Sequence, residues 1–135
     1  MILVSHYFQK PHSPEQEKSA SDLLASVNAL CHEAQQAGVF DFSNDPDTGS
    51  PISGSNGGDG DGGFRTPGSK TGASLSPHRK ALAVDVYDPS DKLDSWLTDA
   101  KLEAYGLYRE HPDWTKGWVH FQFIPPASGK RSFRP

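Results

Sequence analysis

The clearest pattern of hydrophobic and polar positions in this chain is an apolar stripe with helical spacing near its N-terminus. The stripe has the spacing of one side of an amphipathic helix and consists of Leu23, Leu24, Val27, Leu30, Cys31 and Ala34. Before it, Ser13 begins the sequence Ser-Pro-Glu-Gln, which has the form of a helix capping box with proline in the first turn. Gly38 can end the helix, because glycine readily adopts the left-handed conformation found after a last turn. The pattern predicts a helix that begins within residues 14–20 and ends at about Ala37.

Two shorter segments in the second half of the chain alternate between apolar and polar positions, as strands with one buried face do. Residues 81–87 place a leucine and two valines on one face and Asp85, flanked by small alanines, on the other. Residues 118–124 place a valine and two phenylalanines on the core face, and His120 and Gln122 on the opposite face. We therefore predict two strands that each carry polar side chains on the face away from the core.

A second helix is predicted between these two strands. Ser90 and Asp91 can cap its start, and Gly106 can end it. Its apolar residues lie at helical spacing and are Leu93, Trp96, Leu97, Ala100 and Ala104. Together with the first helix and the two strands, this pattern predicts an α+β fold in which two main helices accompany a small antiparallel sheet.

Residues 41–74 separate the first helix from the strands and hold most of the chain's 13 glycines. Because they combine this glycine content with little apolar periodicity, we predict a long surface loop. Two interpretations stay open, a flap that faces a substrate or plain disorder. Asp59 and Asp61 resemble part of a calcium-binding loop, but the required glutamate does not follow, which disfavours calcium. Residues 126–135 form a basic tail that we expect to be loosely tied.

Composition limits the possible functions. A chain of 135 residues suits one domain with one core, so we expect a single domain over residues 1–135 that acts as a monomer. Its 13 basic and 17 acidic residues give a net charge of −4 without long blocks of either sign, which argues against a nucleic-acid partner. The lone cysteine, Cys31, excludes an intramolecular disulfide and is expected to be a buried core thiol. The apolar run at the N-terminus is too short for a signal peptide or a membrane span, so we expect synthesis in the cytoplasm and no membrane insertion.

Three residues on these segments can serve as ligands of a catalytic zinc ion: His78, Asp85 and His120. Two imidazoles and one carboxylate are a ligand set that zinc accepts, with the fourth position left for water. His78 lies shortly before the strand of Asp85, so a turn between them can fold the imidazole back over the carboxylate. His120 reaches the same face if the two strands are neighbours. The alternative, that each histidine is an ordinary surface or hydrogen-bonded residue, stays open on these grounds alone.

The sequences SPHRKALAVDVYDP and GWVHFQ resemble the motifs of the zinc D-alanyl-D-alanine carboxypeptidase and L-Ala-D-Glu endopeptidase family, which shares a fold with the Hedgehog signalling domain. The resemblance spans most of the chain and extends to small phage and prophage members. It implies that His78, Asp85 and His120 bind zinc. It also implies that Arg65, in GFRTPG, and Ser76 lie on the substrate side of the site. The expected reaction is hydrolysis of peptidoglycan stem peptides, at L-Ala-D-Glu or D-Ala-D-Ala bonds, by a phage lysis protein that reaches the cell wall after release.

The chain departs from this family at the residue that transfers protons. Active relatives carry a glutamate three residues before the last histidine or an aspartate two residues after it, and here those positions hold Gly117 and Gln122. A carboxamide can orient water but cannot take its proton, and general-base assistance is typically worth about 10²–10⁴-fold in rate. Gln122 is therefore a candidate for positioning water. Glu110 and Asp113, in the loop before the last strand, are candidates for the missing base, with His111 a third, although such loop residues are more often merely solvated.

Three hypotheses for the function remain. We favour a zinc-dependent peptidoglycan peptidase, for which Trp118, on the face of His120, is a candidate platform for the substrate. The amide at Gln122 favours instead a catalytically weak zinc-containing module that binds the cell wall or serves as a phage accessory protein. The third hypothesis, a structural phage protein, is disfavoured by the intact ligand set. For Trp118 a second interpretation stays open, a rim residue that covers the core.

Overall fold

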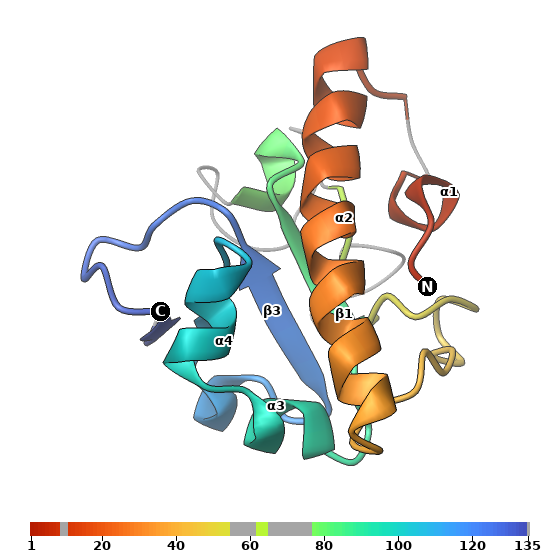
Figure 1. The fold of residues 1–135 in the computed structure, drawn as a ribbon. Coiled ribbons are helices and arrows are strands. Elements are labelled where there is room, and N and C mark those ends of the chain that lie inside the picture. Colours follow the sequence, from red (N-terminus) through yellow and green to blue (C-terminus); the bar gives the residue numbers. More distant parts are fainter. Residues whose placement is uncertain (9–10, 55–61, 65–76, 135) are drawn as a thin grey trace.

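The computed structural model describes residues 1–8, 11–54, 62–64 and 77–134 and has an α+β fold built around one four-stranded sheet (Figure 1). The helical segments are α1 (Val4–Tyr7), α2 (Pro14–Gln36), η1 (Pro77–Lys80), α3 (Lys92–Trp96), α4 (Asp99–Ala104) and η2 (Pro112–Trp114), where η marks a 3-10 helix. The strands are β1 (Ala83–Tyr87), β2 (Tyr108–Glu110), β3 (Trp118–Gln122) and β4 (Ser132–Phe133). The expected α+β class is confirmed, and β1 and β3 are the two strands predicted from alternation.

The strands lie in the order β1-β3-β2-β4. β3 pairs antiparallel with both β1 and β2, whereas β4 runs parallel to β2. β4 comes from the basic tail, which joins the sheet through hydrogen bonds from Arg109 N–H to Arg131 C=O (2.8 Å) and from His111 N–H to Phe133 C=O (2.7 Å). The sheet is thus mixed rather than purely antiparallel, and the expectation of a loosely tied tail is wrong for Ser132 and Phe133. A strand of two residues is too short to show an alternating pattern in the sequence.

α2 forms where the apolar stripe predicts it. Ser13 Oγ accepts a hydrogen bond from Gln16 N–H (3.1 Å), and the Gln16 side-chain oxygen accepts one from Ser13 N–H (2.7 Å), so the capping box is complete. Gly38 follows the helix with a φ of 76°, in the left-handed region. The buried residues of α2 are Ala20, Leu23, Leu24, Val27, Leu30, Cys31 and Ala34. The predicted stripe is therefore the core face, and Cys31 is a buried thiol as expected.

The second predicted helix is broken into α3 and α4. Leu97 is extended, with φ −66° and ψ 141°, so α3 stops before it. Thr98 then caps α4, because its side chain accepts a hydrogen bond from Lys101 N–H (3.2 Å). A threonine that caps a new helix competes with continuation of the previous one. The prediction of one continuous helix is wrong for this reason, although Leu93 and Leu97 are buried as their spacing predicted.

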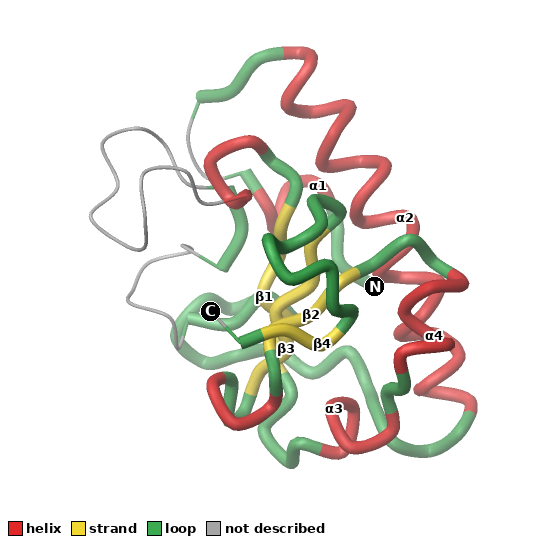
Figure 2. Tube along the Cα trace, turned by 90° about the vertical axis from the view of Figure 1, so that its left-hand side faces the viewer, coloured by secondary structure: helices red, strands yellow, loops and turns green. Residues whose placement is uncertain are grey.

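The two faces of the sheet differ in character. Helices α2, α3 and α4 lie to one side of the sheet and η1 lies to the other (Figure 2). The strand residues that belong to the apolar core are Val84, Val86, Val119 and Phe121. Asp85 and His120 alternate with these residues and are direct partners in the β1–β3 register. Strand alternation therefore separates the core from the polar face, as the sequence predicted.

Part of the glycine-rich segment is packed rather than exposed. Residues 51–53 run along the outer edge of β1, where Ser53 N–H donates to Asp85 C=O (2.9 Å). Ile52 in this stretch is 1% exposed and belongs to the core. Gly62 C=O accepts a hydrogen bond from Asp85 N–H (2.7 Å), so both backbone groups of Asp85 are bonded to this segment. The predicted surface loop is wrong for these residues, because one isoleucine and backbone hydrogen bonds produce no periodic pattern in the sequence.

Candidate metal centre

The three predicted metal ligands come from three separate segments. His78 lies in η1, Asp85 in β1 and His120 in β3. Asp85 and His120 are brought together by strand pairing on the face away from the helices. His78 reaches them because the chain turns sharply between η1 and β1, where Ala81 adopts a φ of 58°. The turn folds the imidazole back over the carboxylate, which is the arrangement expected from the sequence.

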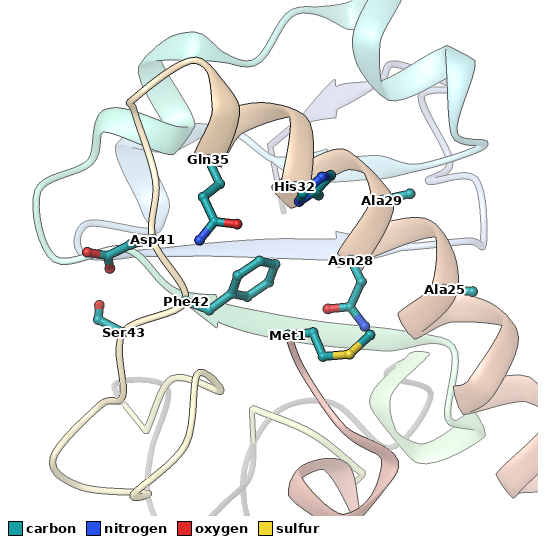
Figure 3. Close-up of a pocket in the computed structure, with 9 residues that line it drawn as sticks. All are labelled: Met1, Ala25, Asn28, Ala29, His32, Gln35, Asp41, Phe42 and Ser43. Carbon is teal, nitrogen blue, oxygen red and sulfur yellow. The ribbon is translucent and has the colours of Figure 1, made fainter.

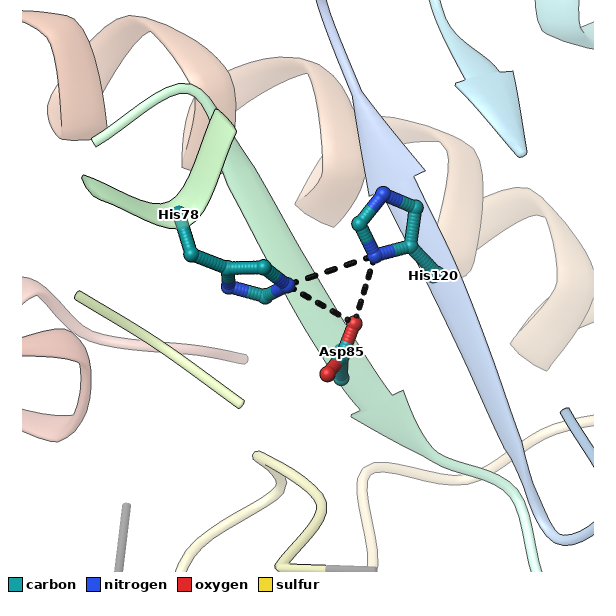
Figure 4. Close-up of side chains that lie close together, drawn as sticks. All are labelled: His78, Asp85 and His120. Atoms are coloured by element: carbon teal, nitrogen blue, oxygen red, sulfur yellow. Dashed lines mark hydrogen bonds and ion pairs between the residues drawn. The ribbon is translucent and has the colours of Figure 1, made fainter. Parts of the chain in front are cut away.

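The inward-facing atoms of these residues form a compact triangle, which we call the metal triangle (Figure 4). His78 Nε2 lies 3.3 Å from His120 Nδ1 and 3.2 Å from Asp85 Oδ1, and His120 Nδ1 lies 2.8 Å from Asp85 Oδ1. Ligand atoms at the usual zinc distances of about 2.0–2.1 Å are about 3.3 Å apart at the corners of a tetrahedron. Two edges of the metal triangle have nearly this length, and the third is a hydrogen bond. The group could therefore bind a metal ion with a small lengthening of one edge.

The outward-facing nitrogen of each histidine is also hydrogen-bonded. His78 Nδ1 lies 2.8 Å from Gly63 C=O, which can only accept, so Nδ1 carries the proton. His120 Nε2 lies 2.6 Å from Gln122 Oε1. The Gln122 side-chain amide in turn donates to Ile124 C=O (2.6 Å), which fixes its orientation. With protons held on the outer nitrogens, His78 Nε2 can offer its lone pair to a metal, and His120 Nδ1 can do so once it loses the proton that it donates to Asp85.

Burial makes the charges of the metal triangle interact strongly. Burial by itself raises the pKa of Asp85, which is 0% exposed, but the adjacent His78 and His120 outweigh it and hold that pKa well below its usual range. Burial lowers the pKa of His120, yet the hydrogen bond to Asp85 and the negative charges of Asp85 and Glu110 raise it above the ordinary histidine value. The site thus favours a carboxylate with positive charge beside it, and a metal cation can replace the proton there.

The Gly63 carbonyl, which bonds to the outer nitrogen of His78, is held in place by close backbone packing. A Cβ atom at Gly63 would lie 2.6 Å from Tyr7 C=O, and one at Gly62 would lie 2.2 Å from Ser53 C=O. Only glycine can approach other backbone this closely. The carbonyl that orients His78 is therefore fixed between α1 and the edge of β1. Sequence reasoning missed this role, for which the available signal was a Gly-Gly-Phe sequence within an otherwise polar segment.

Gln122 and Trp118 lie on the same face of β3 as His120, one on each side of it. The Gln122 amide bonds to the His120 nitrogen that faces away from Asp85, so it orients a candidate metal ligand. Its role in positioning water stays a prediction. Trp118 is 8% exposed and is paired with Tyr87, which leaves little of its surface for a substrate platform.

Among the candidates for the missing base, Glu110 has the most favourable position. The antiparallel β2–β3 register, continued by one residue, places Glu110 opposite His120 on the same face. Its negative charge also contributes to the raised pKa of His120. Asp113 instead lies in η2 with 68% of its side chain exposed, and its backbone N–H donates to His111 Nδ1 (3.2 Å). The structure therefore places Glu110, but not Asp113, in the row of cross-strand neighbours that contains Asp85 and His120, which we call the row of the metal triangle.

Four residues considered in the sequence lie outside the described residues. They are Arg65 and Ser76, on the expected substrate side, and Asp59 and Asp61, the pair compared with a calcium loop. The roles of Arg65 and Ser76 stay predictions, and a calcium site at Asp59 and Asp61 stays disfavoured by the sequence.

A second acidic cluster, formed by Asp88, Asp91 and Asp94, has structural partners. The Asp88 carboxylate accepts a hydrogen bond from Asp94 N–H (3.2 Å) at the start of α3. Asp91 accepts one from Gly117 N–H (2.6 Å). Asp94 forms a buried ion pair with Arg109 (2.9 Å). These bonds account for the cluster without a metal ion.

A cavity of about 760 Å³ lies beside α2, between the N-terminus and the segment that follows the helix (Figure 3). Its lining residues are Met1, Ala25, Asn28, Ala29, His32, Gln35, Asp41, Phe42 and Ser43. None of them belongs to the metal triangle, so the cavity is a feature separate from the metal centre.

Comparison of the chain with protein-family models, with curated proteins and with solved structures found no match. The family resemblance and the Hedgehog-type fold therefore stay hypotheses. Among the described residues, no helix combines the length and the apolar character needed to span a membrane.

Proposed function

We propose that the chain is a zinc-dependent peptidase that hydrolyses peptidoglycan stem peptides at L-Ala-D-Glu or D-Ala-D-Ala bonds. The observation that carries the proposal is the metal triangle of His78, Asp85 and His120, whose donor atoms are buried and close to tetrahedral spacing. Three protein ligands, rather than four, are typical of catalytic zinc sites. The choice of substrate rests on the sequence resemblance, and in this proposal the protein acts on the cell wall after release, as a phage lysis protein.

The side chains in and around the metal triangle would each have a separate role in such a reaction. When bound, zinc polarises a carbonyl and lowers the pKa of water to about 7. Asp85 balances the positive charge, and Gln122 holds the His120 ring in the orientation required of a ligand. Glu110, half-buried in the same row of the sheet, is the residue that we assign to proton transfer. Its carboxylate can take a proton and return it to the leaving amine.

The proposal is tested by measuring bound zinc and peptide hydrolysis on the same preparations. The wild-type protein should bind one zinc ion per chain, release soluble fragments from purified peptidoglycan, lose this activity with a chelator and regain it with added zinc. Asp85→Asn should lose both zinc and activity. The matched change Asp22→Asn, at an exposed position of α2, should keep both. A wild-type protein without zinc would contradict the metal centre, and a zinc-loaded protein that hydrolyses no stem peptide would contradict the peptidase.

A catalytically weak zinc module that binds the cell wall is the second candidate function. One observation favours this module. Among the described residues, the group of donor atoms that lie within 4.8 Å of one another contains no carboxylate besides Asp85. Zinc binding together with adsorption to peptidoglycan, but without hydrolysis, would support this module over the peptidase.

A further inference from the structure

A second row of side chains crosses the polar face of the sheet beside the row that contains the metal triangle. The antiparallel β2–β3 register pairs Tyr108 with Gln122. The parallel β2–β4 register, continued by one residue, places Arg131 beside Tyr108. Paired residues of neighbouring strands project to the same face. Tyr108 and Arg131 therefore lie on the face of His120, on the far side of β3 from Asp85.

Arg131 is held in a defined position but keeps hydrogen-bond donors for a ligand. Its guanidinium carbon lies 4.2 Å from the centre of the Tyr108 ring, and its Nη1 donates to Leu107 C=O (3.1 Å). Within the described part of the chain, no carboxylate forms an ion pair with it. An arginine has five N–H donors in a planar fork that matches the two oxygens of a carboxylate. Stacking on Tyr108 reduces the side-chain freedom that would be lost on binding.

We propose that Tyr108 and Arg131 form a subsite for a free carboxylate of the peptide substrate. The inference rests on the proposed peptidase function, because it takes the metal triangle as the place of the scissile bond. From the strand spacing of about 4.8 Å and the rise along a strand, the Tyr108 ring lies roughly 10 Å from the metal triangle. An extended peptide covers about 3.3–3.6 Å per residue, so the bound carboxylate belongs to a residue about three positions from the scissile bond.

The charges around the site agree with a subsite at that distance. Glu110 lies in the row of the metal triangle and would repel a second carboxylate placed close to it. Arg131 lies in the neighbouring row, where its positive charge is not neutralised by an ion pair with a described residue. A substrate with a negative charge at this distance is therefore favoured over the same peptide with a neutral amide.

The test measures binding rather than hydrolysis. The probe is a synthetic stem peptide whose scissile amide is replaced by a non-hydrolysable bond, prepared once with free carboxylates and once with the distal carboxylate amidated. Its dissociation constant for the zinc-loaded protein is measured by calorimetry. Arg131→Gln removes the charge of the subsite, and Lys130→Gln removes the same charge from the exposed neighbouring residue.

We expect wild-type protein and Lys130→Gln to bind the free carboxylate about 10-fold or more tightly than the amide, as hydrogen bonds to charged groups allow. Arg131→Gln should bind both peptides equally. Equal binding of both peptides by the wild type, no binding of either, or an undiminished preference in Arg131→Gln would overturn the subsite. Because one arm changes only the peptide, the test does not depend on the folding of a variant.

Hydrolysis of the unmodified peptide, measured separately, keeps this inference distinct from the proposed function. A protein that shows the Arg131-dependent preference but never cleaves would retain the carboxylate subsite and contradict the peptidase. A protein that cleaves the free and amidated peptides with equal affinity and rate would retain the peptidase and contradict the subsite.

Discussion

Gln122 connects the outer nitrogen of His120 to the backbone beyond β3, and replacing it separates the two roles considered for this residue. Its side-chain oxygen lies 2.6 Å from His120 Nε2, and its side-chain nitrogen donates to Ile124 C=O at 2.6 Å. The residue is 5% exposed. The substitution Gln122→Leu keeps a side chain of similar size but leaves the N–H of His120 and the C=O of Ile124 without these partners.

The expected losses follow from this geometry. Removing the hydrogen-bond partner of a ligating histidine typically weakens metal affinity about 10–100-fold, which is about 1.4–2.7 kcal/mol. A buried polar group left without a partner costs about 1–3 kcal/mol in the free energy of unfolding. We therefore expect Gln122→Leu to bind zinc about 10–100-fold more weakly and to unfold at a lower urea concentration. Gln122→Glu should keep most of the zinc affinity, because a carboxylate oxygen can accept the same bond from His120.

The assay is competition for zinc with a chromophoric chelator, combined with urea unfolding and with kcat on a stem peptide. If Gln122 positions water instead, Gln122→Leu should keep its zinc affinity and lose only kcat. Unchanged zinc affinity together with a lower kcat would refute the reasoning from the hydrogen bonds and restore the role predicted from the sequence.

Three further perturbations act on other parts of the site. Glu110→Gln should lower kcat about 10²–10⁴-fold while zinc affinity measured by chelator competition stays within a few-fold of wild type, and an unchanged kcat would exclude Glu110 as the proton carrier. Gly63→Ala should lower the free energy of unfolding by about 1–3 kcal/mol and weaken zinc binding, because its Cβ would lie 2.6 Å from Tyr7 C=O; unaffected urea unfolding would contradict this packing. Zinc affinity should fall as the pH is lowered through the raised pKa of His120, because proton and metal compete for the same nitrogen, and affinity that is independent of pH would contradict that competition.

The parts of the fold that the sequence predicted are those that depend on neighbouring residues. The start of α2 follows from Ser13 and Gln16, which bond to each other within one turn. The faces of β1 and β3 follow from alternation. The break between α3 and α4 has a local signal in Thr98, but the apolar spacing on both sides of it favoured one helix. The packing of Ile52 against β1 and the pairing of β4 with β2 depend on contacts between distant segments, which leave no local pattern.

The same distinction applies to the candidate site. The grouping of the three candidate ligands was predictable because spacing, strand alternation and a family resemblance all indicate His78, Asp85 and His120. The residues that orient these three side chains were not predictable. Gly63 contacts His78 from 15 positions away through a backbone carbonyl, which every residue type possesses. The role of Gln122 was also hidden, since the sequence does not show which ring nitrogen of His120 faces the metal triangle.

The complete burial of Asp85 fits a site that could bind a cation. A charged residue on a strand that is buried on both faces conflicts with the local pattern, and such conflicts are typical of functional positions. Burying an ion costs several kcal/mol unless nearby charges and hydrogen bonds compensate it. Here the compensation comes from two histidines, whose inner nitrogens lie 3.2 Å (His78 Nε2) and 2.8 Å (His120 Nδ1) from Asp85 Oδ1. A divalent cation could take the place of the proton between His120 Nδ1 and Asp85 Oδ1, and it would interact with His78 Nε2 as well, which that single proton does not.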